Sequence, residues 1–304
     1  MTQSAWKPRA NRIREGSRLA DVFIYALLVL ICLITLYPMY YVFILSISDP
    51  LEAASMRVYF YPKGFYLESY KMLLQDMRLW RSYWNTFIYI IADTFLMLTV
   101  CVLCSYPLTS GRLIGRKALT IFLLIPMYFS GGLIPTYLVM TRLHLYNNIW
   151  AIIIPGAVNI WNIILCHTYF RSIPEDMREA AKIDGASHFQ ILLRIYLPLA
   201  TPILAVIAIY TIVGVWNDWF RPMVYLPDEA LQPLQLYLRR VLVQQNIDFS
   251  QLSSTEAEAL ARQRLSNLQI RYSMIIFTTL PIIFVYPFFQ KYFVKGVMLG
   301  SLKG

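Results

Sequence analysis

The chain has 304 residues, of which 58% are hydrophobic and only 14% are charged, and its mean hydropathy is +0.52. Soluble domains normally carry about 25% charged residues, so this composition excludes an ordinary soluble enzyme or binding domain. The formal net charge of +10 is not gathered into a basic surface with interleaved aromatic residues. We therefore expect no nucleic-acid partner and attribute the excess of cations to contact with anionic membrane lipid.

Six apolar segments are long enough to cross a membrane as helices. They cover residues 22–47, 85–107, 118–140, 149–169, 199–220 and 269–290. Together they take up nearly half of the chain and leave no room for a separate soluble catalytic domain. The sequence predicts an all-α integral membrane protein with six transmembrane helices.

The distribution of charge predicts the topology. Residues 1–20 form a basic tail, and such segments are retained in the cytoplasm. Six crossings then return a second tail, residues 291–304, to the same side. Residues 21–290 form one six-span domain between the tails. On this topology the segments 50–84 and 221–268 are external, and the loop at 170–198 is cytoplasmic.

Two of the predicted spans contain helix-breaking residues. The third span carries Pro126, Gly131, Gly132 and Pro135, which predicts a broken helix, tolerated at membrane depth only against protein or a wet cavity. The fourth span carries Asn159 and Asn162, which share one helical face. These two amides either hydrogen-bond neighbouring helices or line a translocation path.

The fifth span ends in Trp216-Asn217-Asp218-Trp219. An acid and an amide between two indoles suit the hydroxyls and apolar ring faces of a sugar. The alternative is an interfacial tryptophan belt beside a solvated acid. Both interpretations stay open. The external cations Arg221, Arg239, Arg240 and Arg271 could attract an acidic sugar, anchor the chain at the interface or contact a binding protein.

The cytoplasmic loop is polar, although it lies between two apolar segments. Capping boxes beginning at Ser172 and at Ser187 predict two helices, and Gly185 between them stands where a helix end requires positive φ. The first helix should present Met177, Ala180, Ala181 and Asp184 on one face. A helix lying on lipid headgroups should be basic, whereas acids outnumber bases here. We expect this face to dock against a protein, with the charges of Glu179, Lys182 and Asp184 fixing its orientation.

Metal and nucleotide chemistry have little support in the sequence. Cys101 and Cys104 match C-x-x-C, but no second pair completes a zinc site, and the three histidines are scattered. No phosphate-binding motif is present. We expect no metal site and no cofactor in this chain.

The cytoplasmic loop resembles a known signature. Glu179-Ala180-Ala181, then Gly185, then Ile195-x-Leu197-Pro198 match the EAA loop of the permeases of binding-protein-dependent ABC importers. In that family the loop forms a coupling helix that docks into a cleft of the cytoplasmic ATPase. The resemblance assigns this coupling role to Glu179, Ala180, Ala181, Asp184, Gly185, Ile195, Leu197 and Pro198.

Other motifs narrow the resemblance to carbohydrate-uptake permeases. These are Trp84-Asn85-Thr86, Ile134-Pro135-Thr136-Tyr137, Trp216-Asn217 and Tyr292-Phe293-Val294-Lys295-Gly296. Residues 129–135 and 233–236 are similar to the subgroup that imports oligosaccharides and polysaccharide fragments, including uronate-containing ones such as alginate or aldouronates.

The resemblance implies a type I ABC importer permease fold with cytoplasmic termini, in a bacterial plasma (inner) membrane. It also implies a non-catalytic chain that assembles with three kinds of protein: a second homologous permease, two copies of an ATPase that bind ATP and Mg, and an extracytoplasmic solute-binding protein. An ion-coupled secondary transporter or channel is the alternative, but it needs ionisable residues deep in its spans. The predicted spans have almost none away from their ends, and Asp93 in the second span is the exception. A membrane enzyme would need a His, Cys or carboxylate constellation at one membrane face.

Overall fold

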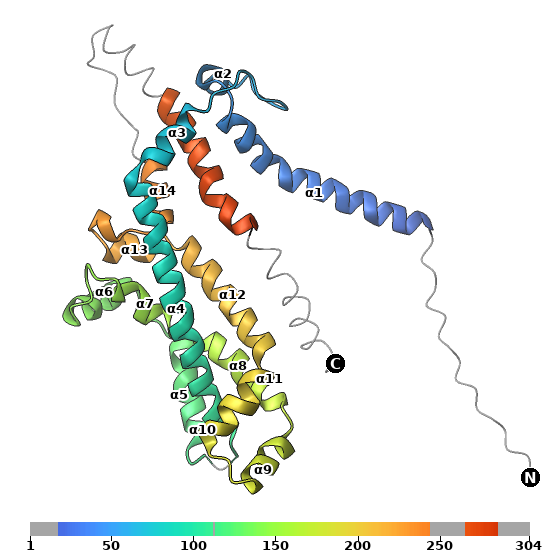
Figure 1. Cartoon of the computed structure of the whole chain (residues 1–304), viewed down its shortest axis with the longest axis vertical. Coiled ribbons are helices and arrows are strands. Elements are labelled where there is room, and N and C mark those ends of the chain that lie inside the picture. Colours follow the sequence, from blue (N-terminus) through green and yellow to red (C-terminus); the bar gives the residue numbers. More distant parts are fainter. Residues whose placement is uncertain (1–17, 112, 244–264, 285–304) are drawn as a thin grey trace, which may run out of the picture.

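A computed structural model describes residues 18–111, 113–243 and 265–284 (Figure 1). Within these ranges all regular structure is helical and no strand is formed, which confirms the all-α prediction. The tails at 1–17 and 285–304 and the middle of the second external segment, 244–264, lie outside the described residues. The predictions made for those stretches therefore stay predictions.

The first helix, α1 (Arg18–Ser46), runs away from the rest of the molecule (Figure 1). Most of its length from residue 20 exposes its side chains, as expected of a span that faces lipid or another subunit. Only its last turn is packed, where Ile44 and Leu45 are buried with Ala53 and Val58. Gln269 fastens this end to the helix at 265–284 by donating to the carbonyl of Leu45 at 2.8 Å.

The central element is α4 (Met77–Thr109), a helix of 33 residues. It packs against α7 (Trp150–Gly156), α8 (Ile160–Ser172) and α12 (Thr201–Asn217). One apolar cluster surrounds its first half and includes Tyr89 and Trp216. A second cluster surrounds its other half and includes Cys101, Cys166 and Tyr196. Cys101 and Cys166 are thus buried apolar side chains.

The third predicted span is broken, as its glycines and prolines indicate. It consists of α5 (Arg116–Tyr128) and α6 (Leu133–Arg142), which meet at 113°. Gly132 adopts φ +83° at the break, a conformation that L side chains rarely adopt. The fifth span is also bent: the helical run at 188–199 meets α12 at 76°.

Among the described residues, three helices are long and apolar enough to cross a bilayer, and two more spans result if each bent pair is counted as one. The sixth predicted span, 269–290, is described only as far as residue 284, and residues 265–284 are helical. Five short elements complete the fold outside the spans. They are α2 (Pro50–Ala54), α3 (Glu68–Gln75), α13 (Phe220–Tyr225), the 3-10 helix η2 (Glu229–Leu231) and α14 (Leu234–Val243).

Candidate functional site: an exposed loop helix and a cavity inside the bundle

The loop helix α9 (Glu175–Ile183) begins without the predicted capping box. The Ser172 hydroxyl instead donates to the carbonyl of Tyr169 at 2.7 Å, inside the last turn of α8. Pro174 occupies the cap position, and the Glu175 carboxylate pairs with Arg178. The prediction for Ser172 was wrong because Ser172 is the last residue of α8, and α9 begins only at Glu175 with Pro174 in the cap position.

The end of α9 has the predicted geometry. Gly185 adopts φ +78°, and its N–H donates to the carbonyl of Lys182 at 3.0 Å. The second predicted capping box is present: Ser187 N–H donates to Gln190 Oε1 at 2.8 Å, and Gln190 N–H donates to Ser187 Oγ at 3.3 Å. The left-handed glycine and the second cap are therefore confirmed.

The outer face of α9 is presented to solvent. Glu179, Ala180 and Asp184 are exposed, as the docking prediction requires. Ala181 differs, because it is half-buried against the second apolar cluster. Ile183 is 87% exposed, although sequence reasoning did not select it. Its large apolar side chain in a polar loop could have identified it from the sequence, because exposed apolar groups of this kind mark protein contacts.

The remaining signature residues connect the loop to the bundle. The chain continues through α10 (His188–Ile191), a π-helical turn at Leu192–Tyr196 and α11 (Leu197–Leu199). Ile195 and Leu197 pack against the second apolar cluster, whereas Pro198 is exposed. Pro198 has no N–H for the carbonyl of Arg194 and its ring crowds that group, so the preceding turn widens to the π form. Ala181, Asp184, Gly185 and Ile195 meet around a cavity of about 440 Å³ between α9 and this run.

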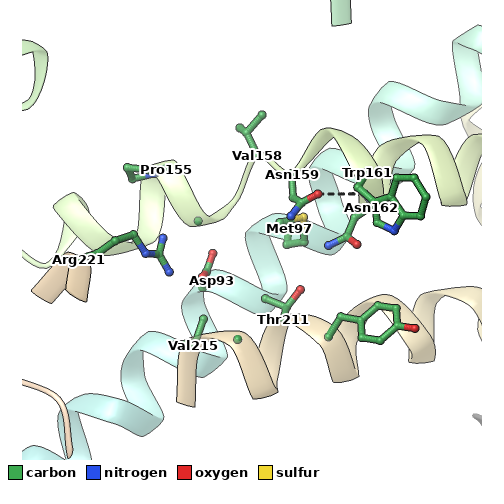
Figure 2. A pocket seen from close by; sticks show the side chains of 13 residues that line it. Asp93, Met97, Pro155, Val158, Asn159, Trp161, Asn162, Thr211, Val215 and Arg221 are labelled. Atoms are coloured by element: carbon green, nitrogen blue, oxygen red, sulfur yellow. Dashed lines mark hydrogen bonds between the residues drawn. The ribbon is translucent and has the colours of Figure 1, made fainter. Parts of the chain in front are cut away.

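A second cavity, of about 480 Å³, lies among α4, α7, α8 and α12 (Figure 2). Both predicted path residues on the fourth span line it. Asn159 caps α8, and its Oδ1 accepts from the N–H of Asn162 at 3.2 Å. Asn162 itself is only 4% exposed. The helix break at residues 157–159 turns both amides toward this cavity, as expected of irregular backbone at membrane depth.

Trp216, Asn217 and Asp218 do not form a common site. Trp216 is buried with its ring against Tyr83 and Phe87, and Asn217 donates to the carbonyl of Val213 at 2.9 Å, within its own helix. Asp218 accepts from the N–H groups of Phe220 and Arg221 and pairs with the Arg221 side chain. The acid is therefore half-buried and paired within the chain, and Trp216 is a core residue. Trp219 is the more exposed indole.

The cavity also contains residues that sequence reasoning did not bring together. Asp93 from α4 is 1% exposed, and its Oδ1 has no hydrogen-bond partner. The guanidinium of Arg221 points toward it across the cavity (Figure 2). Trp161 lies at the opposite end (Figure 2), and Tyr210 also lines the cavity. A single acid in a long apolar span was the available signal for Asp93.

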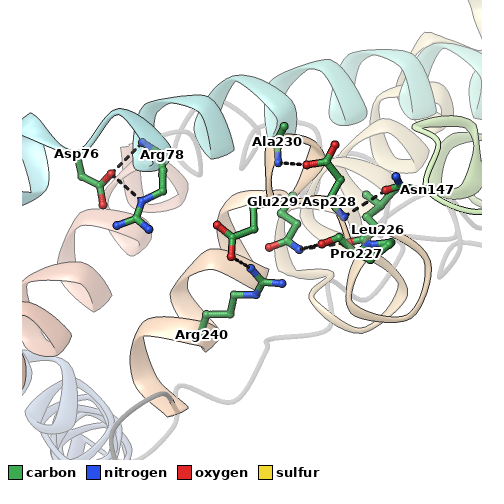
Figure 3. A network of polar contacts seen from close by, with 10 residues as sticks. Asp76, Arg78, Asn147, Leu226, Pro227, Asp228, Glu229, Ala230 and Arg240 are labelled. Carbon is green, nitrogen blue, oxygen red and sulfur yellow. Dashed lines mark hydrogen bonds and ion pairs between the residues drawn. The ribbon is translucent and has the colours of Figure 1, made fainter.

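Three of the four arginines predicted to be external have partners within the chain, whereas the buried Nε of Arg271 has none in the described part of the chain. Arg221 pairs with Asp218, and Arg240 contacts Glu229 at 2.7 Å (Figure 3). The Arg239 guanidinium lies 3.5 Å from the ring centre of Trp219, a cation–π contact. Within the described residues, no group of three or more His, Cys, Asp or Glu side chains could hold a metal ion.

Broken membrane helices around a partly polar cavity, joined to an exposed helical loop, define the fold of a membrane permease. A family model described as "Binding-protein-dependent transport system inner membrane component" matches residues 10–299. The chain belongs to this family of ABC transporter permeases.

Individual relatives agree with this assignment. The chain is 36% identical to protein LplC of Bacillus subtilis, with 89% of this chain and 90% of LplC covered. It is 33% identical to the polygalacturonan/rhamnogalacturonan transport system permease protein YtcP of the same organism, with 95% of this chain and 99% of YtcP covered. Among solved structures, it is similar to a chain of a bacterial ABC transporter involved in the import of the acidic polysaccharide alginate. That match has a TM-score of 0.83 and 34% identity, and covers 95% of this chain and 100% of the other.

Proposed function

We propose that this chain forms half of the transmembrane path of an ATP-driven importer for an oligosaccharide or a polysaccharide fragment. Uronate-containing fragments such as alginate belong to this range, since YtcP and the alginate transporter are named for acidic polysaccharides. The observation that carries the proposal is a direct mechanical link. The exposed helix α9 continues through residues 188–199 into α12, which lines the cavity inside the bundle.

The importer needs further subunits. We assign this chain to the bacterial plasma membrane as a six-span protein with both termini in the cytoplasm. Its partners are a second homologous permease, two cytoplasmic ATPase subunits and an extracytoplasmic solute-binding protein. ATP and Mg are bound by the ATPase subunits, and this chain performs no catalysis and holds no cofactor.

In this mechanism α9 is the lever. Closure of the ATPase pair moves Glu179, Ala180 and Asp184, which are exposed on α9. Ile195 and Leu197 transmit the movement because they are packed into the bundle. The helical run at 188–199 is bent against α12, so movement of this run shifts α12. A shift of α12 changes the shape of the cavity that Asn159 and Asn162 line. Such coupling requires a rigid element with discrete arrangements.

Reconstitution of the complete complex tests this function. The complex, purified with its ATPase, is placed in liposomes, and ATP hydrolysis is measured with the solute-binding protein and neutral or uronate oligosaccharides in turn. We expect stimulation by one sugar class. Ile183→Asp, on the exposed end of α9, should remove most of it. Ile114→Asp, at a residue 94% exposed on the other cytoplasmic loop, should not.

Two results would contradict the proposal. If no ATPase accompanies the chain and uptake follows an ion gradient, the secondary transporter is the correct class, with Asp93 as its ionisable group. If Ile183→Asp and Ile114→Asp leave stimulation equally intact, α9 does not dock to the ATPase.

A further inference from the structure

The cavity inside the bundle has an unusual balance of charge at one end. Of the described residues that line it, Asp93 and Arg221 are the charged ones. Arg221 is already engaged outside the cavity, because its Nε donates to Asp218 and its Nη1 donates to the carbonyl of Ile152 at 3.4 Å. One guanidinium therefore serves two carboxylates, and this end of the cavity carries an excess of negative charge.

Asp93 has unused capacity as an acceptor. The residue is 1% exposed, and its buried Oδ1 accepts no hydrogen bond. Buried polar groups nearly always have a partner, so an unpaired carboxylate oxygen at a cavity wall indicates a missing donor. A hydrogen bond to a carboxylate is about twice as strong as one between neutral groups. A sugar hydroxyl can supply that donor.

The rest of the wall fits the other parts of a sugar ring. Asn159 and Asn162 provide amide groups that both donate and accept. Trp161, which is 54% exposed, supplies aromatic surface at the far end from Arg221 (Figure 2), and Tyr210 also lines the cavity. The cavity volume of about 480 Å³ lies in the range of small-molecule sites. A polar end and an aromatic end match a ring with hydroxyls on its edge and C–H groups on its faces.

We propose that this cavity is a subsite for an uncharged sugar unit, and that Asp93 is its specificity-determining residue. This inference rests on the proposed transport function and goes further by naming the chemistry that the site accepts. Asp93 accepts hydrogen bonds from ring hydroxyls, while the excess negative charge repels a uronate carboxylate. A transported fragment that mixes neutral and uronate units places a neutral unit here and holds its carboxylates outside this subsite.

Direct binding to the purified complex, without the solute-binding protein, tests the inference. The probes are methyl glucoside and methyl glucuronide, which share a ring and differ in charge. For the wild-type complex we expect tighter binding of the glucoside. Asp93→Asn should weaken the glucoside about tenfold and bring the ratio of the two affinities close to one. Glu68→Gln removes an equal charge from the exposed surface of α3 and should leave both affinities unchanged.

A second variant does not depend on the buried carboxylate. Val158 lines the cavity and is 55% exposed, so Val158→Lys adds a cation with little effect on folding. It should raise the affinity for the glucuronide relative to the glucoside. Equal binding of both probes by the wild type, or an affinity ratio that neither variant changes, would overturn the subsite. The proposed function is tested separately by ATP-driven uptake in the wild type, which would remain intact in that case.

Discussion

Asp93 lies directly against Gly156, where the middle of α4 crosses the end of α7. A Cβ placed on Gly156 would overlap both oxygens of the Asp93 carboxylate. The Asp93 carboxylate can therefore keep this position only because residue 156 has no side chain. The same close contact sets the Asp93 carboxylate into the wall of the cavity (Figure 2).

This contact predicts opposite outcomes for two glycines of the same cavity. Gly156→Ala should destabilise the protein by about 1–3 kcal/mol, the usual cost of overpacking a filled core. Gly214→Ala should be neutral or stabilising, because nothing lies within 4 Å of its added Cβ and Ala favours a helix interior by roughly 0.5–1 kcal/mol. Thermal unfolding in detergent measures both. In an Asp93→Ala background the cost of Gly156→Ala should largely disappear, and a cost that persisted there would contradict the contact.

Gly185 is expected to tolerate Asn but not Val. A non-glycine residue in the left-handed region costs roughly 1–2 kcal/mol, and β-branching adds to that strain, whereas Asn adopts this region more readily. Gly185→Val should therefore impair ATP-driven uptake, and Gly185→Asn should retain most of it. Gly111→Val is the control, because Gly111 also has open space around its Cβ but lacks a positive φ. Normal uptake by Gly185→Val would show that the end of α9 need not be held in this conformation.

The cap at Ser187 should hold the start of α10 in place. Ser187→Ala removes the acceptor of the Gln190 N–H, and loss of such a cap costs about 1 kcal/mol. Hydrogen exchange at residues 188–191 should accelerate without a matching change in α4. Ser172→Ala is the matched control, since the Ser172 hydroxyl only bonds within its own helix. Equal effects of the two substitutions on this segment would argue against the cap.

The elements that the sequence predicts well depend on local chemistry. The apolar segments, the positive φ of Gly185 and the cap at Ser187 follow from the residues at those positions. The break near Gly132 follows from its glycines and prolines, but its angle of 113° does not. Such an angle is set by packing between helices that are distant in sequence.

The cavity shows the same limit more clearly. Asn159 and Asn162 could be placed on one helical face, because both belong to one predicted span. Asp93 and Arg221 come from separate helices, and no periodicity relates them. Trp216 illustrates the reverse error: a tryptophan near the end of a span suggests an interface or a ligand, whereas here it fills the core. The structure was needed to decide which polar residues share a site.

Outside the spans, the start of α4 is tied to α14 through Asp76 and Tyr237. Asp76 caps α4 by accepting from the N–H of Arg78 at 2.9 Å, it pairs with the Arg78 side chain, and it accepts from the Tyr237 hydroxyl (Figure 3 shows the Asp76–Arg78 contacts). Burial alone would raise the pKa of Asp76, but the hydrogen bonds from Tyr237 and Arg78 outweigh burial and lower it. The folded state thus favours the ionised carboxylate.

Tyr237→Phe should therefore destabilise the protein by about 1 kcal/mol at neutral pH, and the loss should depend on pH. Because the folded pKa of Asp76 is depressed, its contribution is complete above the unfolded pKa and disappears as the pH falls through the folded pKa. The difference in thermal stability between wild type and Tyr237→Phe should accordingly be constant from neutral pH to about pH 5 and shrink under more acidic conditions. Tyr61→Phe, at a residue 67% exposed, should have the same thermal stability as the wild type at both neutral and acidic pH. A difference for Tyr237→Phe that stayed constant into acid would mean that the hydroxyl acts by packing rather than through the ionised Asp76.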